Sequence, residues 1–268
     1  MNRIDKKFIE LKKKNKKAFI VFITAGYPNL AATAKLVLEL QDQGADIIEL
    51  GVPFSDPLAD GPVIQAASEY SLKKGTNLVK ILDLVKKLRI HTDLPICLMT
   101  YYNPVFCFGD RHFVDQAIAA GVDGVIVPDL PPEEAKEFTR YANNKGLANI
   151  CFLAPTSSLA RIKTISKVAK GFIYYVSLTG VTGSRKTMAA DLKTNLAKIK
   201  RVTRKPVCVG FGISNAAQAR RASKIADGVI IGSAIVNKIR ENITRRDLVR
   251  RVGNFARRFT AVCTKRLN

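Results

Sequence analysis

The chain has 268 residues, of which 47% are hydrophobic and 25% are charged. These values are ordinary for a globular protein and exclude a disordered or collagen-like chain. The net charge of +22 departs from expectation, because the chain holds 44 basic residues and only 22 acidic ones.

The basic excess lies in the segments 3–17, 193–205 and 238–266, where Lys and Arg recur at helical spacing between Ile, Leu and Val. This pattern predicts solvated faces of amphipathic helices. Nucleic acid is therefore not an expected partner despite the charge, and binding through these helices remains an alternative.

The longest apolar runs, 18–25 and 225–231, are too short to span a bilayer, so no membrane association is expected. The charged amino terminus lacks the pattern of a secretory signal, and we expect a cytoplasmic protein, with the plastid stroma as the alternative. The five cysteines lack CxxC spacing, and neither His91 nor His112 has a second histidine at ligand spacing. We therefore expect reduced thiols and no metal site.

Short β-branched runs alternate with longer segments of helical spacing about eight times along the chain. We predict an extra helix at the amino terminus and strands at 18–24, 46–51, 95–101, 124–128, 148–153, 172–177, 206–210 and 228–232. We predict further helices at 30–43, 78–89, 111–120, 132–144, 158–169, 192–203, 215–222 and 246–263.

The ends of several predicted helices carry capping residues. Gly44, Gly121 and Gly146 follow helices, and Ser158 and Ser214 precede them. Because no GxGxxG motif follows the first strand, the eight units predict a single-domain (β/α)8 TIM barrel over residues 1–268. An open doubly wound sheet is the alternative.

Chemistry in such barrels collects at the carboxyl ends of the strands. Glu49 follows Ile47 and Ile48, so alternation can direct its carboxyl into the barrel mouth, where desolvation raises a pKa toward neutrality. A structural carboxylate is the alternative. Asp60, beyond a proline-rich turn, could supply a second carboxylate, and Asp56 could take that place or be only a turn residue.

Three glycine-bearing loops predict a phosphate-bearing substrate. Segment 177–187 is rich in Gly and hydroxyl side chains, which suits a mobile lid or, alternatively, a flexible surface loop. The predicted seventh and eighth strands end in 210–214 and 232–235, where barrels typically bind phosphate. Gly232 and Ser233 open a short helix, whose free amides attract an anion.

The run 49–62, ELGVPFSDPLADGP, resembles the signature of the tryptophan synthase α subunit family. Similar residues follow in the family's order over nearly the whole chain. They are Phe22 and the segments 101–104, 128–129, 180–183, 210–214 and 232–235. Another phosphate-binding barrel isomerase or lyase is the nearest alternative, and the 54–62 motif argues against it.

The resemblance implies a lyase of tryptophan biosynthesis that cleaves indole-3-glycerol phosphate to indole and D-glyceraldehyde 3-phosphate by a retro-aldol reaction. It implies that Glu49 moves protons at the indole C3 and the glycerol hydroxyl, and that Asp60 accepts a hydrogen bond from the indole N–H. The implied indole pocket is formed by Phe22, Tyr101, Tyr175 and Phe211, and the implied phosphate amides are those of Gly183, Gly212, Gly232 and Ser233.

The resemblance also implies a partner. No metal or organic cofactor is expected in this subunit, whereas a β subunit with bound pyridoxal phosphate would receive indole in an α2β2 assembly. The 53–62 loop is expected to face that β subunit.

Overall fold

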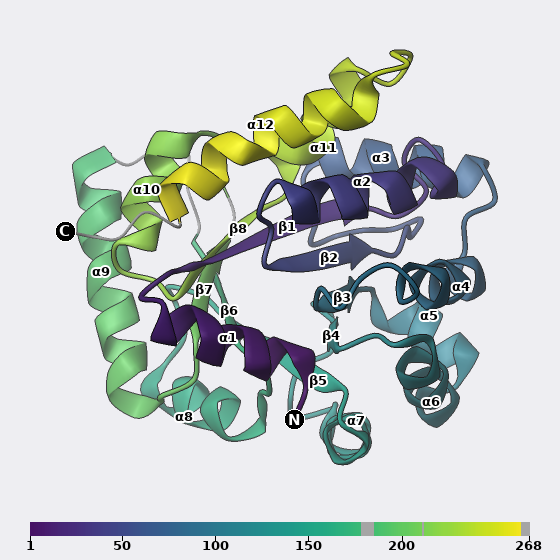
Figure 1. The fold of residues 1–268 in the computed structure, drawn as a ribbon. Helices are drawn as coiled ribbons and strands as arrows, with labels where there is room; N and C mark the ends of the chain where they lie inside the picture. The colour runs from purple at the N-terminus through teal and green to yellow at the C-terminus, as the bar shows by residue number, and fades with distance from the viewer. Residues whose placement is uncertain (178–184, 211, 264–268) are drawn as a thin grey trace.

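The fold is a parallel barrel, seen in a computed structural model that describes residues 1–177, 185–210 and 212–263, with the backbone alone over 185–190. Within these ranges the chain forms a closed barrel of eight parallel strands, in which each strand pairs with the next and β8 pairs with β1 (Figure 1). The strands are β1 Ala18–Thr24, β2 Ile47–Gly51, β3 Ile96–Met99, β4 Gly124–Ile126, β5 Ala148–Leu153, β6 Ile173–Val176, β7 Val207–Gly210 and β8 Gly228–Ile231.

Helices surround the barrel and connect its strands (Figure 1). The first six are α1 Arg3–Lys13, α2 Leu30–Asp42, α3 Pro62–Lys73, α4 Leu78–Leu88, α5 Tyr102–Phe108 and α6 Asp110–Ala120. The others are α7 Lys136–Lys145, α8 Leu159–Val168, α9 Arg185–Val202, α10 Ala216–Ser223, α11 Ser233–Glu241 and α12 Leu248–Cys263. The predicted TIM barrel with an extra amino-terminal helix is confirmed.

Strand pairing determines which side chains point into the lumen. Phe22, Glu49, Cys97 and Gly124 are paired in register across β1 to β4, so their side chains lie on the same face of the sheet. A Cβ on Gly51, two residues after Glu49, would lie 2.5 Å from the Phe22 ring. The Glu49 charge on this face contributes, after burial, to the raised pKa values of Tyr174 and Cys208 on β6 and β7, which are not neighbours of β2, so the shared face is the inner one.

The extra helix α1 closes the amino-terminal end of the barrel. A Cβ on Gly124 would lie 3.0 Å from the Cδ1 atom of Ile4 in α1. The Phe8 ring of α1 lies 5.8 Å from the Phe172 ring. Beside α1, buried Asp123 accepts hydrogen bonds from Arg89 at 2.7 Å and from the Ile96 amide at 2.9 Å. The candidate catalytic site is therefore at the opposite end of the barrel, at the carboxyl ends of the strands.

Several predicted boundaries changed. Helices α3 and α5 lie in segments for which no helix is predicted. Asn215, not Ser214, caps α10 by accepting a hydrogen bond from the Gln218 amide at 3.0 Å, whereas Ser158 caps α8 as predicted. The caps at Gly44, Gly121 and Gly146 all have positive φ, as predicted. Within the predicted 177–187 loop, residues 178–184 lie outside the described residues and 185–187 belong to α9.

Candidate active site

Glu49 lies within β2, and its side chain is fully buried. Its charge contributes, after burial, to raising the pKa values of Cys97, Tyr174 and Cys208 on three other strands. Only a carboxyl inside the lumen can act on β3, β6 and β7 together. Neither carboxylate oxygen has a hydrogen-bond partner among the described residues.

This isolation changes the protonation of Glu49. Burial raises the pKa of its carboxyl from the ordinary 4.5 to about 8, and no partner among the described residues offsets the desolvation. At neutral pH the carboxyl is therefore mostly protonated, and it can give up its proton to a substrate atom and take one back.

Asp60 follows β2 in the loop that leads to α3. Its carboxylate accepts a hydrogen bond of 3.1 Å from the Tyr101 hydroxyl, which in turn accepts one of 2.9 Å from the Ala59 amide. The Phe54 ring stacks on that of Tyr101, at 5.2 Å between centroids. Tyr101, at the end of β3, thus holds the loop over the barrel mouth.

The pKa of the Asp60 carboxyl differs from that of Glu49. Burial raises it from 3.8 to about 6, and the hydrogen bond from Tyr101 opposes the rise. At neutral pH Asp60 is therefore mostly ionised. Two carboxyl groups whose environments separate their pKa values can divide the acid and base roles.

Tyr174 lies near both carboxyl groups. Burial is the first cause of its raised pKa, and the charges of Glu49 and Asp60 follow. Both carboxyls therefore lie near one side chain at the carboxyl end of the lumen. Asp56, the alternative to Asp60, is exposed and accepts a hydrogen bond of 2.6 Å from Ser55, so it turns to solvent instead.

The predicted pocket residue Tyr175 points the other way, and this prediction is wrong in placement. Phe152 pairs with Tyr174, and Phe152 lies four residues after Ala148, which is on the Glu49 face. Tyr175 is therefore on the outer face. Burial raises the pKa of the Tyr175 hydroxyl to about 12. Of the two residues of α9 that also act on this pKa, Asn195 lowers it and Asp191 raises it.

The lumen contains Phe22, together with two aromatic residues that sequence reasoning missed. Phe22 is buried and its ring covers Gly51. Phe152 and Tyr174 lie with their ring centroids 4.8 Å apart. For Phe152 the signal is alternation along the correctly predicted strand 148–153, whereas β6 offers no contrast between its two faces and so gives no such signal for Tyr174.

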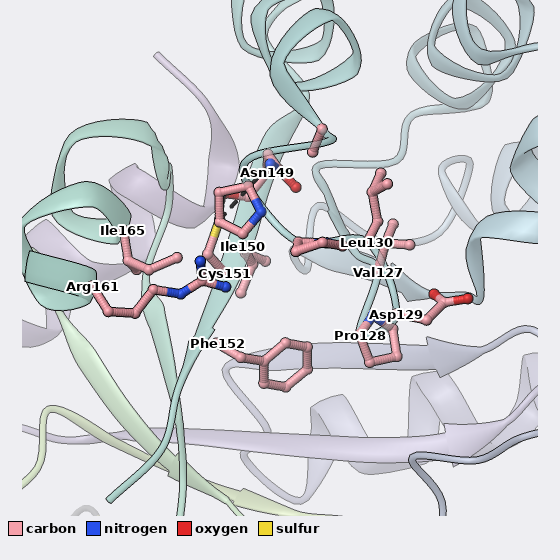
Figure 2. A pocket seen from close by; sticks show the side chains of 13 residues that line it. Val127, Pro128, Asp129, Leu130, Asn149, Ile150, Cys151, Phe152, Arg161 and Ile165 are labelled. Atoms are coloured by element: carbon pink, nitrogen blue, oxygen red, sulfur yellow. Dashed lines mark hydrogen bonds between the residues drawn. The ribbon is translucent and has the colours of Figure 1, made fainter. Parts of the chain in front are cut away.

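A cavity of about 130 Å³ lies at the carboxyl ends of β4 and β5 and extends toward α8. Figure 2 shows the Phe152 ring near Pro128 and the Arg161 side chain reaching toward Cys151. Arg161 also forms an ion pair with Glu133, with a distance of 2.6 Å to Oε2. Because neither Glu49 nor Asp60 lines it, this cavity is distinct from the carboxyl pair.

The predicted phosphate end lies at the neighbouring ends of β7 and β8. Gly212 has a φ of +71°, which favours glycine, and Gly232 caps α11. The Ile235 and Val236 amides make the first hydrogen bonds to the Gly232 carbonyl, so the amides of Ser233 and Ala234 precede this ladder and can meet an anion. Gly183 and Phe211 lie outside the described residues.

The described part of the chain contains neither a candidate metal site nor a candidate membrane span. No group of three or more His, Cys, Asp or Glu side chains there is arranged to hold a metal ion. No helix there has the length and apolar character needed to cross a membrane.

Comparison with known proteins gives a consistent result. The family model described as tryptophan synthase alpha chain matches residues 8–263. A tryptophan synthase alpha chain of Geotalea uraniireducens is 52% identical over 255 residues, which is 95% of both chains, and that of Geobacter sulfurreducens is 52% identical over 95% of this chain and 96% of its own.

Solved structures agree with the sequence relatives. Tryptophan synthase subunit alpha from Legionella pneumophila superposes with a TM-score of 0.92 at 38% identity, over 98% of each chain. A tryptophan synthase structure from M. tuberculosis, in its aminoacrylate-bound form, matches with a TM-score of 0.87 at 32% identity, over 98% of this chain and 100% of that one. The chain belongs to the tryptophan synthase alpha chain family, whose members cleave indole-3-glycerol phosphate in tryptophan biosynthesis.

Proposed function

We propose that Glu49 and Asp60 together carry out the retro-aldol cleavage of indole-3-glycerol phosphate. The observation that carries the proposal is the buried Glu49 carboxyl, which has no hydrogen-bond partner among the described residues, together with an Asp60 carboxylate held by Tyr101. With a pKa of about 8, Glu49 begins protonated and donates its proton to the indole C3. The resulting carboxylate takes the proton of the glycerol hydroxyl as the carbon–carbon bond breaks, which restores the protonated acid.

Asp60 has the complementary role in this proposal. With a pKa of about 6 it is ionised at neutral pH and accepts a hydrogen bond from the indole N–H. Protonation at C3 places positive charge on the indole ring, and a fixed carboxylate stabilises that charge. The electrons of the broken carbon–carbon bond return to the indole ring, and indole and D-glyceraldehyde 3-phosphate are released.

The aromatic side chains of the lumen are proposed to form the indole pocket. Phe22, Tyr101, Phe152 and Tyr174 are the described residues that support this role. The amides of Gly212, Gly232 and Ser233 are proposed to bind the phosphate, since the start of α11 presents free N–H groups. The predicted contributions of Gly183 and Phe211 remain predictions.

The assay measures indole release from indole-3-glycerol phosphate, with and without a β subunit. Glu49→Gln keeps the side-chain shape but cannot transfer a proton, and we expect a loss of about 10²- to 10⁴-fold in kcat. Glu134→Gln is the matched control, because it is the same change at an exposed glutamate outside the loop that is expected to face the β subunit. Full turnover by Glu49→Gln would refute the proposal.

The adjacent tyrosines provide a second matched pair. Tyr174→Phe is expected to lower kcat, because Tyr174 lies near both carboxyl groups. Tyr175→Phe is expected to leave turnover unchanged, because Tyr175 faces α9. The opposite ranking in the same indole assay would contradict the placement of the two side chains.

The family implies a β-subunit partner, and we propose the α2β2 assembly with pyridoxal phosphate only in the β subunit. Leu58 and Phe106, exposed by 94% and 67%, lie on the loops and helices at the carboxyl ends of the strands and support docking there. We further propose one catalytic domain over residues 1–268, without a cofactor or metal of its own. The cytoplasm is the proposed compartment, supported by the bacterial sources of the relatives, and the plastid stroma is the alternative.

A further inference from the structure

A groove of about 510 Å³ runs between α11 and α12, on the outside of the barrel. On α11 its lining residues recur from Ala234 to Glu241 with the spacing i, i+3, i+4 and i+7, and on α12 they recur from Arg251 to Arg258 in the same way. Residues at this spacing share one helix face, so two continuous stripes face the groove.

The groove reaches the phosphate end of the site. The short connection 242–247 makes α11 and α12 antiparallel neighbours, and the Lys238 ammonium lies 5.9 Å from the Phe255 ring centroid. Arg258 is one turn beyond Phe255, so it lies level with the first turn of α11. Ser214, from the loop after β7, lines the same groove.

The groove is basic, and one of its cations has no ion pair among the residues that the structure describes. Lys238 pairs with Glu241 at 2.9 Å, and Arg251 pairs with Asp247 at 2.8 Å. Arg258 is exposed, and in the part of the chain that the structure describes its guanidinium has no ion pair or hydrogen bond. An unpaired guanidinium matches the geometry of a phosphate group, which it can bind through two N–H donors.

We propose that this groove captures the phosphate group of the anionic substrate, with Arg258 as its main contact, before the phosphate passes to the amides at the start of α11. The inference rests on the proposed function, because it assigns a route to the same substrate. The amides of Ser233 and Ala234 are neutral donors that act over short distances, whereas the groove adds a longer-range attraction for the anion. Arg258 is thus a positioning residue that acts on binding and not on the chemical step.

The test compares Arg258→Gln with Arg257→Gln by measuring KM and kcat for indole-3-glycerol phosphate over a salt series. Arg257 is the matched control, because it is the adjacent exposed arginine of α12 and does not line the groove. For a guanidinium about 10 Å from a doubly charged phosphate, screened Coulomb attraction corresponds to about threefold in KM at an ionic strength of ~10 mM. The same attraction corresponds to less than about twofold at ~0.15 M.

We expect Arg258→Gln to raise KM at low salt with unchanged kcat, Arg258→Lys to restore much of the loss, and Arg257→Gln to have a smaller effect. Equal shifts in both Gln variants, or none in either, would overturn the proposal. A wild-type chain that releases no indole, with or without a β subunit, would refute the proposed function instead.

A titration with inorganic phosphate, followed by 31P line broadening, tests the groove independently of turnover. Weaker broadening with Arg258→Gln than with wild type and Arg257→Gln supports the groove. Equal broadening in all three overturns it.

Discussion

Replacement of Glu49 by Gln removes a titrating group from the lumen and leaves the size of the side chain almost unchanged. The native carboxyl has a pKa of about 8, whereas the unfolded one has the ordinary 4.5. Between these values the native state holds a proton that the unfolded state has lost, so wild-type stability falls as pH rises. Glu49→Gln is not subject to this loss, and its relative stability should increase with pH.

The size of the effect follows from the two pKa values. At about 1.4 kcal/mol per pKa unit, the raised pKa lowers wild-type stability by about 1 kcal/mol at pH ~5 and by about 3 kcal/mol at pH ~7. The variant should therefore gain about 2 kcal/mol relative to wild type between these two conditions. Below pH ~4.5 both states are protonated and the pH-dependent difference vanishes.

Urea unfolding of wild type and Glu49→Gln at the two pH values measures this gain. Any penalty for burying the Gln amide is the same at both pH values, so it cancels in the comparison. Glu134→Gln, a change at an exposed glutamate, is the control and should show no gain. A difference in stability that stays constant with pH, or that shrinks as pH rises, would refute the reasoning about the isolated carboxyl.

Three further outcomes are expected. The pH profile of kcat/KM should be a bell with limbs at about 6 and about 8, from Asp60 and Glu49, and Asp60→Asn should change the acidic limb. Asp123→Ala should lower the free energy of unfolding in urea by about 3–5 kcal/mol with kcat unchanged, because it leaves Arg89 without its buried carboxylate. Gly210→Ala should lower both kcat and stability, the latter by about 1–3 kcal/mol, because its Cβ would lie 2.4 Å from the Tyr174 hydroxyl oxygen.

The barrel was predictable from the sequence because short apolar runs alternate with segments of helical spacing. Its central carboxyl was predictable because one charged residue lies within an apolar run. Glu49 lies between Ile48 and Leu50, so the sequence itself shows which face of β2 is chemically distinct. The β1 boundaries, Ala18–Thr24, were also predicted without error. Continuous apolar runs bounded by polar segments identify buried parallel strands well.

The orientation of the paired tyrosines could not be predicted in the same way. Residues 172–176 read Phe-Ile-Tyr-Tyr-Val, so both faces of β6 are apolar or aromatic and alternation offers no contrast. An error of one residue in the register moves a side chain to the opposite face. Only the pairing of Tyr174 with Phe152 and Cys208 assigns it to the lumen.

The two helices α3 and α5 were missed for different physical reasons. For α3 a signal was present, because Pro62 occupies the first helical position, where its missing N–H has no cost. For α5 there was little signal, since its seven residues are too few to show periodicity and contain Pro104. Both helices follow strand ends, where we expected loops.

The separation of the two carboxyl groups should increase when substrate binds. An indole N–H that donates to Asp60 stabilises its ionised form, and so lowers its pKa. The apolar ring next to Glu49 excludes water from a carboxyl that already lacks a partner among the described residues, and so favours its neutral form. The same ligand thus pushes the two pKa values apart, because its indole N–H stabilises the Asp60 carboxylate while its ring removes water from around Glu49. The division of roles between Glu49 and Asp60 therefore depends on what surrounds each carboxyl, and not on the difference between Glu and Asp.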